Sequence, residues 1–139
     1  MVAPVIDRSA PAGAHPIQTP ARMALVEAMA ALGPAFEARA ARYDRAAAFP
    51  RENWDDLRAA GLLALCVPAE HGGLGADFVG YALVAEELGR HCATTALTFN
   101  MHCATTLMAG VIADDLDFDD DHRAMLHANW AEQFAGIVQ

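Results

Sequence analysis

Two histidine–cysteine pairs, His91-Cys92 and His102-Cys103, come nearest in residue type to metal or thiol chemistry. A metal site needs several such ligands converging on one point, usually through C-x-x-C or H-E-x-x-H spacing. Neither spacing occurs here, and adjacent residues on a helix point in different directions. The sequence therefore predicts no metal site, and these histidines are interpreted as core or surface residues.

The paired carboxylates Glu86-Glu87 are the next candidates, because two carboxylates can act as acid and base. Neighbouring carboxylates on a helix diverge, so this pair does not suit the two-carboxylate arrangement of a hydrolase. We expect one of them to form an ion pair with an arginine such as Arg58 or Arg90. The sequence assigns no catalytic residue here.

Nucleophilic chemistry has little support in this chain. Its only serine is Ser9, and no G-x-S-x-G elbow is present. The three cysteines, Cys66, Cys92 and Cys103, lie in apolar segments and cannot all pair within one molecule. A reactive thiol needs an exposed, electropositive setting, and we expect Cys66 and Cys103 to be buried. Free cysteines favour a reducing cytoplasm.

The glycine-rich segment Gly72–Gly75 could be mistaken for a phosphate cradle. A dinucleotide fingerprint needs a strand, three spaced glycines, a helix and an acidic residue about 20 positions later. The spacing differs here, and Pro68 interrupts the segment that leads in. We interpret Gly72–Gly75 as a structural turn, after which Asp77 can cap the next helix.

The region that must position these groups is predicted to be helical. Pro50 suits the first turn of a short helix over 51–60, whose inner face would carry Trp54, Leu57 and Ala60. Gly61 suits the position after the helix, because it can adopt a positive φ. A brief apolar run follows and precedes the turn.

Helices are also predicted before and after this region. Thr19 and Pro20 can begin a long helix, in which Gly33-Pro34 predicts a kink or a break. A helix over about 77–90 would have an inner face made of Phe78, Tyr81, Val84 or Ala85, and Leu88. Another helix is expected over about 93–113.

The last helix follows an acidic run, in which residues 114–121 include six aspartates. Mutual repulsion predicts a solvated loop, and Asp121 can cap the helix that follows. Leu126, Trp130 and Phe134 recur every four residues and predict its inner face. Gly136 is expected to end the helix. Residues 137–138 are interpreted as the beginning of a strand.

Composition narrows the class of protein. The 139 residues suit one domain, and the net charge is −9 with nine arginines and no lysine. An acidic chain is a poor ligand for nucleic acid or for anionic membranes. Residues 92–113 carry no charged side chain, but five threonines, Asn100 and His102 favour a buried helix over a membrane span.

The predicted fold class is therefore all-α, a bundle-like domain of about five helices preceded by a disordered tail. The predicted boundaries are 1–19 for the tail, 20–136 for the helical domain, and 137–139 for the start of a further domain. Hydrophobic residues make up 55% of the chain, which predicts an apolar face that meets another domain or subunit.

The order of these features resembles the N-terminal helical domain of the acyl-CoA dehydrogenase family. That family places F-P before a short helix ending L-x-x-x-G-L, then a proline, a G-G-x-G turn, and a helix with E-E-L. The corresponding residues here are Phe49-Pro50, Leu57 through Gly61-Leu62, Pro68, Gly72-Gly73-Leu74-Gly75 and Glu86-Glu87-Leu88.

The resemblance implies an FAD-dependent oxidoreductase that introduces a double bond between Cα and Cβ of an acyl-CoA thioester. Its catalytic base and most of its FAD site would lie in a middle domain and a C-terminal four-helix bundle. These 139 residues would then be a fragment that is inactive alone and binds no FAD alone. Complete relatives imply a homo-oligomer with acyl-CoA as substrate.

By the same resemblance, the helix after E-E-L supplies part of the acyl pocket wall. Counting from Leu88 places Phe99, Asn100, Cys103 and Ala104 there, and the alternative is that all four are ordinary core residues. Three other identities stay open for the chain. These are a non-catalytic helical interaction module, the first domain of a flavin-dependent monooxygenase or acyl-CoA oxidase, and a metal- or redox-sensing protein.

Overall fold

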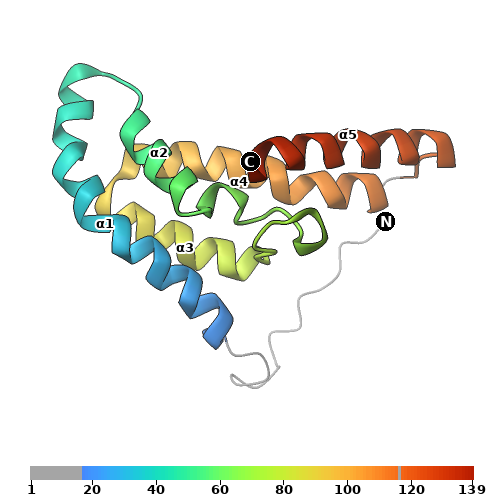
Figure 1. Ribbon diagram of the computed structural model, residues 1–139, viewed down its shortest axis with the longest axis horizontal. Coiled ribbons are helices and arrows are strands. Elements are labelled where there is room, and N and C mark those ends of the chain that lie inside the picture. The colour runs from blue at the N-terminus through green and yellow to red at the C-terminus, as the bar shows by residue number, and fades with distance from the viewer. Residues whose placement is uncertain (1–16, 116) are drawn as a thin grey trace, which may run out of the picture.

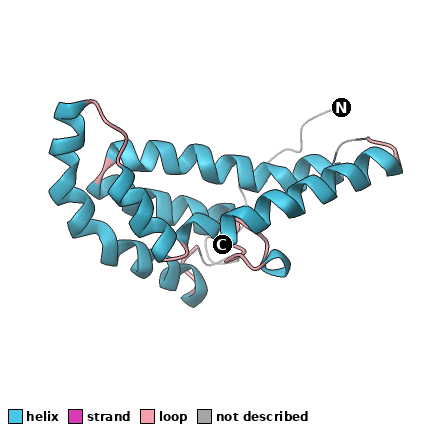
Figure 2. Cartoon of the chain, turned by 45° about the horizontal axis from the view of Figure 1, so that its top comes forward, coloured by secondary structure: helices cyan, strands magenta, loops and turns pink. Residues whose placement is uncertain are grey.

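The computed structural model describes residues 17–115 and 117–139, and within them the regular elements are all helical (Figure 2). The predicted all-α class is confirmed. Of the predicted tail, only residues 17–19 fall among the described residues. The long helices are α1 (Pro20–Ala46), α2 (Arg51–Ala59), α3 (Phe78–His91), α4 (Ala93–Asp115) and α5 (Asp120–Val138), and two short 3₁₀ helices, η1 (Leu62–Ala64) and η2 (Ala69–His71), lie between α2 and α3.

The helix α1 begins where Thr19 accepts a hydrogen bond from the Arg22 N–H, with Pro20 in the first turn. Pro34 does not end the helix, which continues to Ala46. Figure 1 shows instead that α1 bends, as expected where proline removes a hydrogen-bond donor. Gly33, beside the bend, faces the ring of His91 on α3, and an added Cβ would lie 2.3 Å from His91 Nε2.

The helix α2 differs from its predicted inner face at two residues. Leu57 is buried as expected, but Ala60 is exposed and Asn53 is fully buried. Ala60 caps the helix next to Gly61, whose φ of 72° is the left-handed conformation predicted for it. Asn53 can be buried because both ends of its amide are hydrogen bonded, as described below.

The turn after η2 lies against the buried segment that precedes it. The backbone N–H groups of Leu74, Gly75 and Ala76 donate to carbonyls in that segment, at 2.9–3.0 Å. Gly73 approaches so closely that an added Cβ would lie 2.1 Å from the carbonyl oxygen of Val67. The N–H groups of the turn are therefore occupied within the chain, which supports the interpretation of Gly72–Gly75 as a structural turn.

The helix α3 is capped by Asp77, as predicted, through a 2.8 Å bond from the Gly80 N–H. Val84 and Leu88 are buried and Tyr81 is partly buried, but the prediction for Phe78 was wrong, since it is 70% exposed. Phe78 is the first residue of the helix, and its ring contacts Tyr81 with a centroid distance of 5.9 Å.

Four predictions about α5 and the acidic run before it are corrected. The cap of α5 is Asp119, which accepts from the His122 N–H at 2.8 Å, and the acidic run is not all loop because α4 extends to Asp115. The helix also passes through Gly136 to Val138, so no strand begins at residue 137. Ile137 packs against buried residues of the fold from within this last helical turn, which favours continuing the helix.

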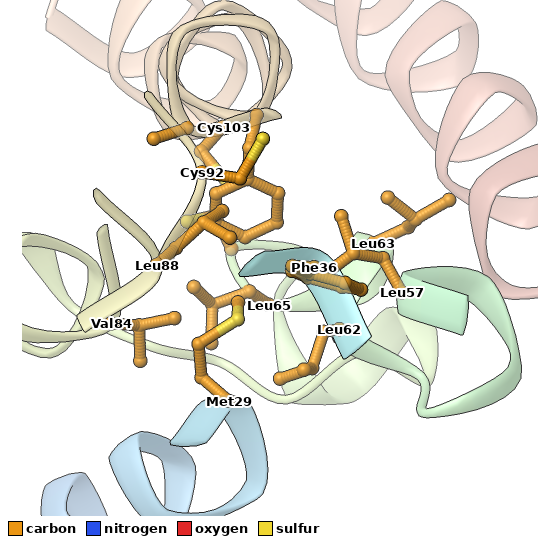
Figure 3. Close-up of a cluster of buried hydrophobic side chains, with 13 residues drawn as sticks. Met29, Phe36, Leu57, Leu62, Leu63, Leu65, Val84, Leu88, Cys92 and Cys103 are labelled. Carbon is orange, nitrogen blue, oxygen red and sulfur yellow. The ribbon is translucent and has the colours of Figure 1, made fainter. Parts of the chain in front are cut away.

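The helices enclose one main core, to which α1, α2, η1, α3 and α4 contribute (Figure 3). Its fully buried side chains include Met29, Phe36, Leu57, Leu65, Val84, Leu88 and Phe99. A smaller cluster, Ala64, Val67, Ala109 and Phe134, lies where α5 meets α4 and η1. We call α5 together with α4 from Ala104 onward the α4–α5 hairpin. Figures 1 and 2 both show it extending beyond the other helices.

Candidate functional site

The helix α4 separates the core from a bare apolar surface. Its inner face contributes Phe99 and Cys103 to the main core, both fully buried. The opposite face carries Leu97, Met101 and Met108, which are 66%, 69% and 55% exposed. These positions fall within a narrow arc of the helix together with the exposed Ala104. We call Leu97, Met101, Ala104 and Met108 the apolar stripe.

The four residues predicted for the acyl pocket divide between these two faces. Phe99 and Cys103 are core residues, and Ala104 belongs to the apolar stripe. Asn100 is partly buried at the edge, and its Oδ1 atom is buried without a hydrogen-bond partner among the described residues. The structure thus does not gather the four side chains into one pocket, and their role in acyl binding stays a prediction.

A cleft lies between α4 and α5, one helical face away from the apolar stripe. Its volume is about 230 Å³, and its lining residues are His102, Thr105, Thr106, Trp130, Gln133, Phe134 and Ile137. His102 is fixed by a 2.7 Å hydrogen bond between its Nε2 and the carbonyl oxygen of Leu63, so Nε2 is the donor. The Trp130 indole nitrogen is buried and has no partner among the described residues.

A second cavity, of about 300 Å³, lies between the start of α1 and the glycine turn. Two of its lining residues, Arg22 and Asp77, form a bidentate pair, one bond of which measures 3.1 Å from Nε to Oδ1. This guanidinium and the Gly80 N–H hold the pKa of Asp77 below its usual range. Because Asp77 is also the α3 cap, the charged groups here join two helices.

The acidic candidates form ion pairs within the fold, and the thiol candidates are buried in it. Glu86 and Glu87 both pair with Arg90, at 3.0 and 3.2 Å, which confirms the predicted ion pair with Arg90. All three cysteines are free and buried. A hydrogen bond with Cys66, together with burial, raises the pKa of the Cys103 thiol, so this sulfur keeps its proton at neutral pH.

The sequence did not indicate the structural roles of two residues, Asn53 and Trp130. The Asn53 Oδ1 accepts from Arg39 at 3.0 Å, and the Asn53 Nδ2 donates to Thr95 at 2.9 Å, which links α1, α2 and α4. Trp130 was assigned only to an inner face, and nothing in its spacing indicated an unpaired indole N–H. Both depend on contacts between segments distant in the sequence.

Among the residues that the structure describes, no group of three or more His, Cys, Asp or Glu side chains lies close enough to hold a metal ion. Within the same residues, no helix has the length and hydropathy required to cross a membrane, and this includes the apolar α4.

The geometry and the sequence agree with a known protein family. The family model described as "Acyl-CoA dehydrogenase, N-terminal domain" matches residues 19–114, which cover α1 through nearly all of α4. The chain belongs to the acyl-CoA dehydrogenase family. In this family member, the matched region contains the main core, the glycine turn and the apolar stripe.

The individual relatives are much longer than this chain. It is 38% identical over 63 residues to the mitochondrial short-chain specific acyl-CoA dehydrogenase of Homo sapiens, covering 45% of this chain and 15% of that protein. KijD3, solved in complex with dTDP, is 33% identical with a TM-score of 0.73, over 86% of this chain and 30% of that one.

The nitrososynthase of Micromonospora carbonacea var. africana is similar to the same extent in structure. It is 28% identical, with a TM-score of 0.73 over 87% of this chain and 29% of the nitrososynthase. The chain thus spans less than a third of each of these three proteins. Their activities therefore cannot be assigned to these 139 residues alone.

FAD is the cofactor that the family implies. A pyrophosphate is usually held by free backbone N–H groups at a helix start or glycine turn. Leu74, Gly75 and Ala76 donate theirs to the chain itself, and Asp77 places a carboxylate beside them. These residues do not fit the phosphate part of the cofactor.

Proposed function

We propose that this chain is the N-terminal helical domain of an FAD-dependent acyl-CoA dehydrogenase-like oxidoreductase. The observation that carries the proposal is the family match over residues 19–114. The enzyme would oxidise the Cα–Cβ bond of an acyl-CoA thioester. FAD and the catalytic base would be held by the middle and C-terminal domains or by a partner subunit, and the assembled enzyme would be a cytoplasmic homo-oligomer.

The contribution of this domain would be packing and one wall of the acyl pocket. The apolar stripe supports this role, because several large apolar side chains in a row on a protein surface mark an interaction site. Ala104 lies on the stripe, and Asn100 lies beside it. Phe99 and Cys103 would act beneath the wall, by fixing the position of α4 against the main core.

The first test uses the chain alone. Purified protein should neither retain flavin nor reduce a dye acceptor when offered acyl-CoA thioesters of several lengths, because its three thiols are buried and the paired carboxylates Glu86 and Glu87 are bound to Arg90. Turnover by the isolated chain would refute this part of the proposal.

The second test concerns the apolar stripe. A chimera would replace the corresponding helical domain of the human short-chain enzyme with this chain, and flavin content and dye reduction would be measured. Met101→Glu should lower both, because it places a charge on the stripe. Ala82→Glu, at an exposed position of α3, should leave them unchanged. Equal behaviour of the two variants would remove the stripe from the proposal.

A second candidate function follows from the similarity to the nitrososynthase, whose name is not that of a dehydrogenase. The chain would then be the first domain of a flavin-dependent monooxygenase. An enzyme of this kind consumes O₂ together with its substrate, whereas a dehydrogenase passes electrons to another acceptor. Oxygen uptake by the complete enzyme distinguishes the two.

A third candidate, a non-catalytic interaction module, is favoured by the same exposed stripe. In that case the purified chain should form a stable oligomer of defined mass. Light scattering after size-exclusion chromatography measures this, and a monomer would count against the module.

A further inference from the structure

Two of the three buried cysteines lie against each other. Cys66 follows η1 in the chain, Cys103 lies on the inner face of α4, and both belong to the main core (Figure 3). Their side chains are hydrogen bonded to one another. The residues beside them are joined as well, because His102 donates to the Leu63 carbonyl at 2.7 Å. Two consecutive residues of α4 thus contact the short segment 63–66, so the pairing of the two sulfurs is part of how α4 packs on this segment.

The third cysteine lacks a thiol neighbour and provides a comparison within the same core. The Cys92 sulfur accepts a hydrogen bond from the Thr95 hydroxyl at 3.1 Å. Cys92 is 4% exposed, which is close to the 6% of Cys66. These two thiols therefore differ in their neighbours and hardly at all in their accessibility. A difference in their oxidation would be due to the sulfur that lies beside Cys66.

The hydrogen bond makes the two sulfurs of the pair unequal. The Cys103 S–H donates to the Cys66 sulfur, which lowers the pKa of Cys66 and raises that of Cys103. Because the thiolate is the nucleophile in thiol oxidation, Cys66 is the sulfur that reacts first. Accessibility favours the same order, since Cys103 is fully buried and Cys66 is not. Cys103 is then in the position of the second thiol, which resolves the oxidised one.

A nucleophilic sulfur with a second thiol in contact is the arrangement that forms a disulfide. We propose that Cys66 and Cys103 are a redox-active pair that hydrogen peroxide converts to a disulfide between α4 and the segment after η1. Cys66 attacks one peroxide oxygen and the O–O bond breaks, which gives a sulfenic acid and water. Cys103 then attacks the Cys66 sulfur, the S–O bond breaks and a second water leaves. The two sulfurs together lose two electrons to the peroxide, and both thiol protons end in water.

The disulfide restrains the helix that carries the apolar stripe. Cys103 faces the main core, whereas the stripe lies on the opposite face of α4. A bond at Cys103 closes the chain between residues 66 and 103 and so holds α4 against the core covalently. In the reduced chain, packing and hydrogen bonds alone hold this part of α4 in place. A dithiol reductant reverses the change, since it exchanges with the disulfide.

The test treats the folded, purified chain with hydrogen peroxide, alkylates the remaining thiols in urea and maps the peptides by mass spectrometry. Free thiols should fall from three to one, with the loss of two hydrogens from the intact mass, and the linked peptides should contain Cys66 and Cys103. Dithiothreitol should restore all three thiols. If the oxidation is carried out in urea instead, the linked peptides should also include Cys92, because unfolding removes the selection by contact.

Three alanine variants assign the roles within the pair. Cys92→Ala is the matched control and should form the same disulfide as the parent. Cys103→Ala should stop at the sulfenic acid of Cys66, which dimedone labels. Cys66→Ala should leave Cys103 as a thiol, because the buried sulfur then has no reactive neighbour. Circular dichroism shows whether each variant is folded, and the peptide map of the parent chain requires no variant at all.

The peroxide concentration is set as the one that fully oxidises the chain in urea. A folded parent chain that keeps its three thiols at this concentration would overturn the proposal. A disulfide to Cys92 in the folded chain would overturn it equally, since it would show that contact between Cys66 and Cys103 does not direct the reaction. Neither result bears on the acyl-CoA proposal, whose tests read flavin and turnover.

Discussion

The main core and the α4–α5 hairpin share the helix α4 but differ in how completely they satisfy their buried groups. In the main core, the buried Asn53 has partners on both sides of its amide. In the hairpin, the buried nitrogens Trp130 Nε1 and Arg123 Nε lack partners among the described residues. The buried amide of Asn53 is therefore satisfied, whereas two of the three unpaired buried atoms among the described residues lie in the hairpin, the third being Asn100 Oδ1 on the preceding part of α4.

The comparison predicts unequal costs for removing equivalent side chains. Phe99→Ala should lower the free energy of unfolding by about 3–5 kcal/mol, because it opens a cavity in the fully enclosed main core. Phe134→Ala should cost only about 2 kcal/mol, since Phe134 borders the cleft and water can enter the space it leaves. Urea unfolding measures both, and equal losses would show that the hairpin is as well packed as the core.

The buried polar groups offer a second contrast. Asn53→Leu should destabilise the fold by about 2–3 kcal/mol, because Arg39 and Thr95 lose their shared partner in a buried place. Asn100→Leu is the control on α4, and it should be neutral or slightly stabilising, since its Oδ1 has no partner to lose. Thermal unfolding followed by circular dichroism tests the pair, and a larger loss for Asn100→Leu would contradict this account.

The smallest expected effect concerns the two aspartate caps. The pKa of Asp77 is lowered by Arg22 and the Gly80 N–H, and that of Asp119 is lowered by the His122 N–H and side chain. A carboxyl with a lowered folded-state pKa adds stability above its unfolded pKa of about 3.9, and this stability is lost as pH falls through the folded value.

Asp77→Asn and Asp119→Asn keep a capping side chain and remove the charge. Asp77→Asn should be the more destabilising at neutral pH, because Asp77 also binds Arg22 across two helices. Its difference from the parent should disappear in acid. Urea unfolding at several pH values checks this, and a difference that persists at about pH 2 would exclude the charge as its origin.

Local signals in the sequence were sufficient for most of the fold. Thr19, Gly61 and Asp77 were assigned correctly because a cap or a positive φ depends on residues within one helical turn. The kink near Pro34 has the same local origin. These features also carried the family resemblance, which the match over residues 19–114 confirms.

The errors arose where distant segments decide the outcome. Asn53 is buried because Arg39 and Thr95 meet it, and these lie 14 and 42 residues away in sequence. Ile137 and Val138 are β-branched, which suggested a strand, but the packing of Ile137 keeps them helical. The cleft could not be predicted at all, since the orphaned indole of Trp130 is defined only when α4 and α5 lie side by side.

Gly73 and Gly89 differ in the space that the fold leaves for a side chain. Gly73 lies so close to the Val67 carbonyl that any side chain would separate the turn from the segment beneath it, while no atom lies within 4 Å of a Cβ added at Gly89. Position 73 therefore tolerates only glycine, whereas position 89 has room for a side chain. Among descendants of this chain, substitutions should therefore accumulate at Gly89 and be eliminated at Gly73. The number of glycines alone does not show which of them the fold requires.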